Sequence, residues 1–102
     1  FYNKKPRLLL NGHFDVIEAD DEDFIAKVKK DKIYGRGSED MKSGVAICIL
    51  LMKEFSKFKN KPNVALLLTS DEETGGEGVK YFLNKGYKAD FVIGVDSGPY
   101  SK

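Results

Sequence analysis

Residues 34–45 have the sequence YGRGSEDMKSGV, a glycine-rich turn that delivers Asp40 to the start of an apolar run. The apolar positions that follow recur at steps of three and four, which predicts a helix from Met41 to Lys57 or Phe58. Its middle, residues 47–51, is apolar on almost every side, so we expect burial against a sheet and against a second neighbour. A carboxylate at the helix entrance either caps the helix or holds a cation, and this stretch alone leaves both interpretations open.

Three apolar runs without alternation predict strands that are covered on both faces, at residues 7–11, 64–69 and 91–95. A small hairpin is expected over residues 24–34, and a second helix from Gly78 to Asn84 or Lys85. The order strand, hairpin, helix, strand, helix, strand is typical of βαβ units, so the sequence predicts an α/β fold.

The composition is that of one globular domain: 102 residues, of which 41% are hydrophobic and 32% charged. A net charge of +1 gives no reason to expect a nucleic-acid or membrane partner, and no apolar stretch reaches the ~18 residues of a membrane span. The single cysteine, Cys48, lies in the apolar run of the predicted helix and is expected in the core. No secretory segment is recognised, so we expect a cytoplasmic protein.

Polar side chains follow each predicted strand. They are His13 and Asp15 after the first, Glu72 and Glu73 after the second, and Asp96 after the third. Because the carboxyl ends of parallel strands meet at one edge of a sheet, we expect these groups to converge there with Asp40. Several carboxylates in one pocket repel each other unless protons or cations compensate them, and histidine with carboxylates is a ligand set of zinc and related metals.

Each of these pieces taken singly also has a structural interpretation. His13 alone is more often a hydrogen-bonded structural histidine, residues 71–73 are more often a solvated turn, and Asp96 could be a cap. The acidic residues 20–23 lack the spacing of a calcium loop and are interpreted as a solvated turn. The joint placement of the pieces after successive strands is what favours a metal site.

Four motifs then carry a family resemblance: Gly-His-x-Asp-Val at 12–16, Tyr-Gly-Arg-Gly-x-x-Asp-Met-Lys-x-Gly at 34–44, Asp-Glu-Glu at 71–73, and Gly-x-Asp at 94–96. From about Leu8 to Gly98 the chain resembles the di-zinc hydrolases that include acetylornithine deacetylase, succinyl-diaminopimelate desuccinylase, aminoacylase and glutamate carboxypeptidase. The resemblance implies a three-layer α/β/α sandwich with a mostly parallel mixed sheet. Residues 1–102 would be only the N-terminal part of the catalytic domain, without its lid or dimerisation domain and its C-terminal part.

The resemblance also implies a metal ligand set for two divalent ions, most simply Zn²⁺, with Co²⁺ or Mn²⁺ as other occupants. His13 and Asp96 would bind the first ion, Asp40 would bridge both ions, and Glu73 would bind the second. The third protein ligand of the second ion would lie outside this chain. In this family the peptide bond after the bridging aspartate is commonly cis, so a cis bond between Asp40 and Met41 is expected.

Two further carboxylates receive catalytic roles from the resemblance. Asp15 would orient His13, and Glu72 would be the general base for the water that bridges the two ions. The implied reaction is hydrolysis of the amide bond of an N-acyl amino acid or short peptide, by a homodimeric parent protein of which this chain alone would be nearly inactive. The alternative is a non-catalytic binding or structural domain with the same fold.

Two other residue pairs complete the expectations for the site. Arg36 and Lys42 could bind a substrate carboxylate, but structural roles are favoured because the family's carboxylate contacts lie mostly elsewhere. Ser38 and Ser43 are not expected to be nucleophiles, since the one histidine is assigned to metal.

Overall fold

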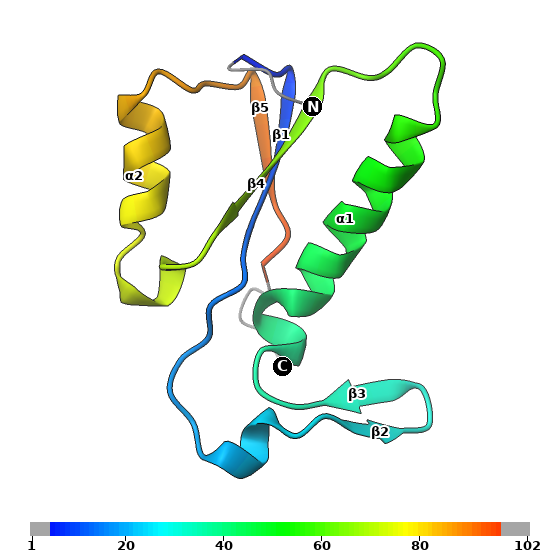
Figure 1. Ribbon diagram of the computed structural model, residues 1–102, viewed down its shortest axis with the longest axis vertical. Helices are drawn as coiled ribbons and strands as arrows, with labels where there is room; N and C mark the ends of the chain where they lie inside the picture. Colours follow the sequence, from blue (N-terminus) through cyan, green and yellow to red (C-terminus); the bar gives the residue numbers. More distant parts are fainter. Residues whose placement is uncertain (1–4, 97–102) are drawn as a thin grey trace, which may run out of the picture.

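A three-stranded parallel sheet forms the centre of the computed structural model, which describes residues 5–96. Its strands are β1 (Leu8–His13), β4 (Val64–Thr69) and β5 (Phe91–Gly94), in the order β4-β1-β5 (Figure 1). Both neighbours run parallel to β1, so all three carboxyl ends lie at one edge of the sheet. The expected turn at residues 97–99, after the last strand, lies outside the described residues.

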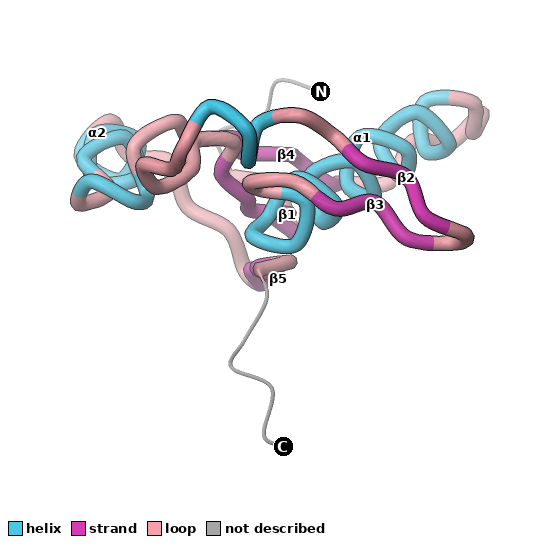
Figure 2. Tube along the Cα trace, turned by 90° about the horizontal axis from the view of Figure 1, so that it is seen from below, coloured by secondary structure: helices cyan, strands magenta, loops and turns pink. Residues whose placement is uncertain are grey.

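The two main helices cover opposite faces of this sheet. Helix α1 (Ser43–Ser56) packs on the face that carries Leu10 and Val64, where the fully buried Cys48 completes the core cluster. On the other face, Leu9 and Asn11 of β1 line a cavity together with side chains of α2 (Glu77–Asn84). Because successive strand residues point to opposite faces, α1 and α2 are separate layers, as Figures 1 and 2 show. The predicted α/β/α sandwich and the core position of Cys48 are confirmed.

The beginning of α1 differs from the prediction. A wide turn, Ser38–Lys42, precedes the helix and is closed by the Lys42 N–H, which donates to the Gly37 carbonyl at 2.9 Å. The predicted start at Met41 is wrong, because Asp40 (φ −105°, ψ 101°) and Met41 (φ −130°, ψ 31°) have non-helical backbone angles. The helix therefore begins at Ser43, after the residues that position Asp40.

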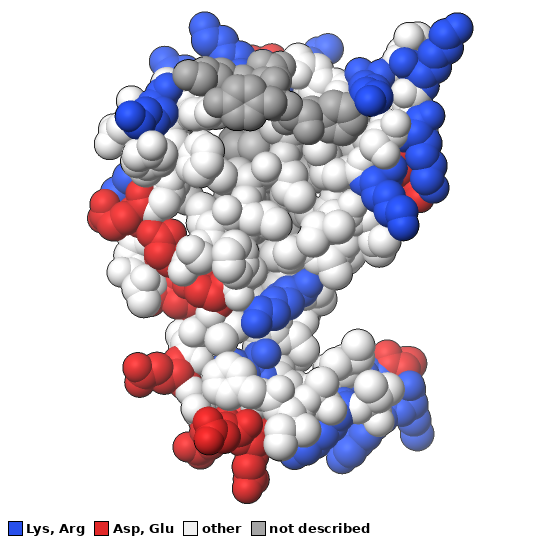
Figure 3. Space-filling view, in the orientation of Figure 1, with Lys and Arg blue, Asp and Glu red and all other residues white. Residues whose placement is uncertain are grey.

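The burial predicted for α1 against a second neighbour, and for β5 on both faces, is not found within the residues that the structure describes. On α1, Ile47 and Leu50 are 55% and 60% exposed, because only the side of the helix that faces the sheet has a neighbour. Strand β5 lies at a sheet edge, and its Phe91 and Val92 are 64% and 60% exposed. Figure 3 shows the molecule from the same side as Figure 1. In its upper part, charged side chains lie mainly along the margins, and uncharged residues fill the middle.

The hairpin is shorter than predicted and stands apart from the sheet. Its strands are β2 (Lys27–Lys29) and β3 (Lys32–Tyr34), which pair antiparallel, and every residue of both strands is exposed to solvent. Residues Asp21–Phe24 form a short helical turn, so the acidic residues 21–23 lie in a turn as expected and only Phe24 had been assigned to the hairpin. The hairpin lies below the N-terminal end of α1 in Figure 1 and leads directly into the glycine-rich turn. Neither helix of the described segment is long and apolar enough to cross a membrane.

Candidate metal centre

His13 is at the centre of the candidate site, at the carboxyl end of the middle strand β1. Its side chain is only 2% exposed, and its Nε2 atom faces three carboxylates that come from different segments. The distances from Nε2 are 3.1 Å to Asp40 Oδ1, 3.8 Å to Glu72 Oε2 and 3.8 Å to Asp96 Oδ2. These carboxylates are about half exposed, so the cluster opens to solvent on the side away from the core.

The other ring nitrogen, Nδ1, is held by Asp15. It lies 3.1 Å from the backbone carbonyl of Asp15 and 3.2 Å from Oδ1 of the same residue. A carbonyl oxygen can only accept, so Nδ1 carries the hydrogen and, in the neutral imidazole, Nε2 carries a lone pair. That lone pair would face the lone pairs of carboxylate oxygens, which is unfavourable unless a proton or a metal ion lies between them.

The surroundings raise the pKa of His13 above its ordinary value. Burial by itself lowers this pKa, but the hydrogen bond to the Asp15 backbone and the charges of Asp15, Glu72 and Asp96 raise it by more. The pKa of Asp15 is lowered: burial raises it, but backbone N–H groups, led by that of Glu73, and the nearby His13 outweigh the burial. The site therefore keeps Asp15 ionised and favours a positive charge at Nε2.

The glycine-rich turn before α1 aims Asp40 at this imidazole. Gly37 adopts a left-handed conformation (φ 78°), and the Asp40–Met41 peptide bond is cis, as expected from the family resemblance. Met41 points inward, where it is 2% exposed and its Sδ accepts a hydrogen bond from the His13 backbone N–H at 3.1 Å. Asp40 and Met41 thus contact two different parts of His13, its side chain and its backbone.

The turn after β4 brings Glu72 and Glu73 to the same place. Asp71 organises this turn, because its Oδ2 accepts the Gly78 N–H at 2.6 Å and its backbone carbonyl accepts the Gly76 N–H at 2.7 Å. The Glu73 N–H donates to Asp15 Oδ2 at 3.0 Å. Asp15 therefore joins the end of β1 to the turn after β4, in addition to contacting His13.

Two overlapping groups of side chains have the composition and spacing to hold a divalent ion. In each group, ligand atoms lie within 4.8 Å of one another: one group combines His13, Glu72 and Glu73, the other His13, Asp40 and Asp96. The six residues to which metal-binding or catalytic roles were assigned thus lie in one cluster or beside it: His13, Asp15, Asp40, Glu72, Glu73 and Asp96. Asp40 and Glu73, the two residues expected to bind the second ion, belong to different groups, although both line one pocket.

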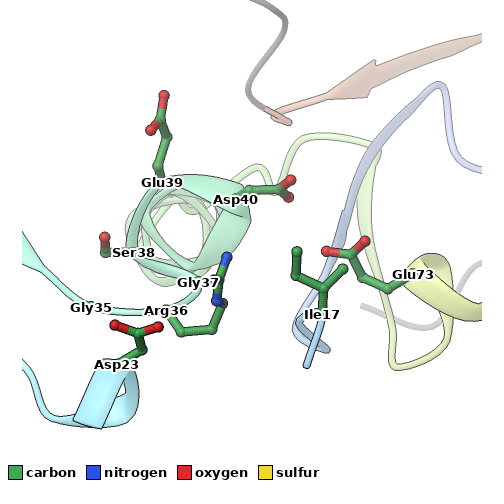
Figure 4. Close-up of a pocket in the computed structure, with 9 residues that line it drawn as sticks. All are labelled: Ile17, Asp23, Gly35, Arg36, Gly37, Ser38, Glu39, Asp40 and Glu73. Atoms are coloured by element: carbon green, nitrogen blue, oxygen red, sulfur yellow. The ribbon is translucent and has the colours of Figure 1, made fainter. Parts of the chain in front are cut away.

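That pocket adjoins the cluster and has a volume of about 400 Å³ (Figure 4). Its wall is formed by the glycine-rich turn, residues 35–40, together with Ile17, Asp23 and Glu73. In Figure 4, Asp40 and Glu73 lie on opposite sides of Ile17, while the Arg36 guanidinium extends toward the space between Asp40 and Ile17.

Two features of the site had only a weak signal in the sequence. The hydrogen bond to the Met41 sulfur depends on a non-helical turn, whereas the apolar pattern had suggested that Met41 was only the first residue of a helix. The environment of Arg36 depends on how that turn folds against residues 17 and 23. The only available signal for either was the glycine content of residues 35–37, which marks a tight turn without specifying side-chain directions.

The fold and the site define an α/β protein in which one buried imidazole and several carboxylates gather at the carboxyl edge of a parallel sheet. The chain belongs to peptidase family M20/M25/M40, whose family model matches residues 9–102. This finding confirms the resemblance expected from the motifs.

Its relatives include proteins named as desuccinylases. The probable succinyl-diaminopimelate desuccinylase of Staphylococcus aureus is 38% identical over 93 residues, which cover 83% of this chain and 23% of the relative. The succinyl-diaminopimelate desuccinylase of Sulfurimonas denitrificans is 37% identical over 101 residues, which cover 90% of this chain and 27% of the relative. The succinyl-diaminopimelate desuccinylase of a Sulfurovum species is 42% identical over 76 residues, which cover 71% of this chain and 20% of the relative. The chain thus spans about a quarter of the length of these relatives or less.

Proposed function

We propose that the protein containing this chain is a zinc-dependent hydrolase that cleaves an amide bond in an N-acyl amino acid or a short peptide. The observation that carries the proposal is the position of His13 Nε2, which lies 3.1–3.8 Å from oxygens of three carboxylates. Family membership supports a hydrolase of this general kind.

The donor set fits divalent metal ions. A buried imidazole with Nδ1 engaged and Nε2 directed at carboxylates is the arrangement that histidine ligands adopt when a second residue orients them. His13, Asp40, Glu73 and Asp96 would hold two ions, with zinc as the leading candidate and cobalt or manganese as the alternatives. When bound, such ions polarise an amide carbonyl and lower the pKa of water.

The chain's own residues would then move the proton. The Glu72 carboxylate would take a proton from the attacking water and deliver it to the nitrogen of the leaving amine. It is about half exposed and its Oε2 lies 3.8 Å from His13 Nε2, so it can reach both the cluster and solvent. Asp15 would keep His13 in the tautomer that presents the Nε2 lone pair, and its bond to the Glu73 N–H would hold the Glu72–Glu73 turn against β1.

The relatives' names suggest the kind of substrate. A succinyl-diaminopimelate desuccinylase, by its name, removes a succinyl group, so a small N-acyl amino acid with additional carboxylates is a suitable candidate here. We further propose that residues 1–102 are part of a larger catalytic domain, in a cytoplasmic protein that forms a homodimer. The partial coverage of the relatives supports the larger domain.

The alternative is a binding or structural domain that has the fold but no activity. Proteins that lose the function of a metal site also tend to lose its ligands, because the buried charges are then no longer compensated. Here every expected position carries a competent residue: His13, Asp40, Glu72, Glu73 and Asp96. This favours the enzyme.

Metal analysis and turnover of the purified full-length protein test the proposal. We expect close to two equivalents of zinc in the wild type and a clear loss in Asp40→Ala. Glu72→Gln should keep its metal and lose turnover by on the order of 10²- to 10⁴-fold, the usual contribution of a general base. A wild-type protein that binds no zinc, cobalt or manganese would contradict the proposal. Glu72→Gln with normal turnover would contradict the role of Glu72.

A further inference from the structure

Arg36 is the one cationic side chain among the residues that line the pocket beside the metal cluster (Figure 4). Its Nε atom is buried and has no hydrogen-bond partner within the described residues 5–96. A buried donor without a partner costs free energy, and such a group in a pocket wall indicates a missing partner. A structural role was expected for Arg36 from the sequence, but its Nε atom makes no hydrogen bond within the described residues that would support such a role.

The backbone around Arg36 is fixed, so its side chain starts from a defined place. The Arg36 N–H donates to the Asp23 carbonyl at 2.8 Å, and the Ser38 N–H donates to the Gly35 carbonyl at 3.0 Å. Gly37 is in close contact with Val16, since a Cβ at Gly37 would lie 2.5 Å from Val16 Cγ1. The backbone of Arg36 is therefore fixed beside the pocket, and only its side chain can move.

The charges that face this pocket decide which ligand it can accept. Its lining includes four acidic residues, Asp23, Glu39, Asp40 and Glu73. In Figure 4 the Glu39 carboxylate points away from Arg36, whereas the Asp23 carboxylate lies beside the Arg36 side chain but does not bond to its Nε atom. Asp40 and Glu73 are proposed metal ligands whose charges bound cations would offset. Once those two carboxylates are compensated, Asp23 is the one carboxylate left beside the positive guanidinium, so the pocket repels an anion much less than the full set of carboxylates would.

We propose that Arg36 binds a carboxylate of the substrate and thereby selects acidic N-acyl amino acids; this inference rests on the function proposed above. A guanidinium matches a carboxylate with two parallel N–H···O bonds, and its unpartnered Nε supplies one of the donors. A pocket of about 400 Å³ lies within the usual range of small-molecule sites. The carboxylate can belong to the acyl group or to the amino acid, and the substrates below distinguish these two sources.

The test uses Arg36→Gln and Arg36→Lys in the full-length protein, with Lys42→Gln as the matched control. The control also removes one positive charge next to the glycine-rich turn, but Lys42 does not line the pocket. For each variant, zinc content is measured first, and then the dissociation constant of succinate is compared with that of the neutral analogue succinamide by titration calorimetry. KM and kcat are measured for an N-succinyl amino acid, for its α-amide and for the N-acetyl amino acid.

We expect Arg36→Gln to keep its zinc and to bind succinate more weakly by on the order of ten- to hundredfold, the value of a charge-assisted pair. Succinamide affinity should change little in every variant. Succinate affinity should change little in Lys42→Gln and should be intermediate in Arg36→Lys. The loss in turnover should appear mainly in KM. The penalty should disappear with whichever substrate lacks the carboxylate that Arg36 binds. If Arg36→Gln loses its fold, Arg36→Lys is judged by the same criteria.

Three results would overturn the inference: unchanged succinate binding in both Arg36 variants, equal losses for succinate and succinamide, or a wild type that binds no succinate. The function proposed above fails separately, through a wild type without metal or without amide hydrolysis. In that case the succinate titration still decides whether Arg36 binds a carboxylate.

Discussion

Asp15 is the residue on which the two halves of the site depend. Its backbone carbonyl and Oδ1 lie 3.1 and 3.2 Å from His13 Nδ1, while Oδ2 accepts the Glu73 N–H at 3.0 Å. Asp15 therefore holds the imidazole of β1, chiefly through its backbone carbonyl, and the turn after β4, through its side chain, in a fixed relation. The charge of Asp15 and its hydrogen bond to Glu73 can be separated by substitution.

Asp15→Asn removes the charge but leaves an oxygen that can accept the Glu73 N–H, whereas Asp15→Ala removes both. We expect zinc affinity to fall by on the order of 10- to 100-fold in Asp15→Asn, the usual effect of losing the group that orients a metal-binding histidine. Zinc affinity should fall further in Asp15→Ala, because the Glu72–Glu73 turn is then also released. Competition with a chromophoric chelator measures both affinities, and Glu18→Gln, an exposed change of equal charge, is the control. Equal affinity in Asp15→Asn and the wild type would show that the charge has no part in metal binding.

The sequence could predict which residues meet at the site but not all of their contacts. His13, Asp40, Glu72 and Asp96 were recognisable because each stands at a strand end or helix entrance, and parallel strands bring such positions together. The contact between the His13 N–H and the Met41 sulfur, and the burial of Arg36 Nε, depend on dihedral angles of one irregular turn. No periodic pattern encodes those angles.

At the level of elements, the close approach of α1 to the end of β5 positions Asp96. Gly44, in the first turn of α1, lies so near this segment that an added Cβ would be 2.5 Å from the Val95 carbonyl oxygen and 2.9 Å from Val95 Cγ2. Val95 directly precedes Asp96 in the chain. A glycine inside a helix is therefore required here by packing.

Gly44→Ala should destabilise the protein, although alanine is favoured over glycine in a helix by about 1 kcal/mol. The Cβ meets backbone that cannot rotate away, and overpacking of this kind costs about 1–3 kcal/mol. We also expect weaker zinc binding, because α1 would push Val95 and Asp96 out of position. Urea unfolding and a zinc titration measure the two effects. The matched control is Gly94→Ala, which lies two positions before Asp96 but has open space for its Cβ, so it should have little effect. A stability gain of about 1 kcal/mol in Gly44→Ala would mean that helix and strand are further apart than in this structure.

The elements themselves were largely predictable, and their surroundings were not. The apolar runs at residues 64–69 and 91–95 correctly indicated strands, because both runs are short and are bounded by turn residues. The same runs could not indicate which neighbours lie in this chain. Strand β5 is the example. Its sequence is that of a covered strand, but it is exposed because it forms an edge of the sheet.

On the scale of the whole molecule, the chain is more open than its length predicts. The radius of gyration is 15.4 Å, compared with about 13 Å expected for a compact domain of 100 residues. The accessible surface is 7996 Å², compared with about 5,800 Å² expected from the scaling for a folded monomer of 11.4 kDa. Large apolar side chains are exposed on α1 and on β5, which is the kind of surface that further protein covers.

We therefore expect the 102-residue chain, produced alone, to have a small fraction of the activity of the full-length protein, on the order of one per cent or less at saturating zinc. The physical reason is that the exposed faces leave α1 and β5 less firmly positioned, and these elements carry Asp40 and Asp96 to the site. Amide hydrolysis by both forms is the measurement, with Glu72→Gln in each form as the background. The isolated chain should also bind the dye ANS, because apolar surface that is covered in the full-length protein is open in it. Turnover by the isolated chain close to that of the full-length protein would show that these exposed faces are not needed to hold the site together, and would end the proposal that residues 1–102 are part of a larger catalytic domain.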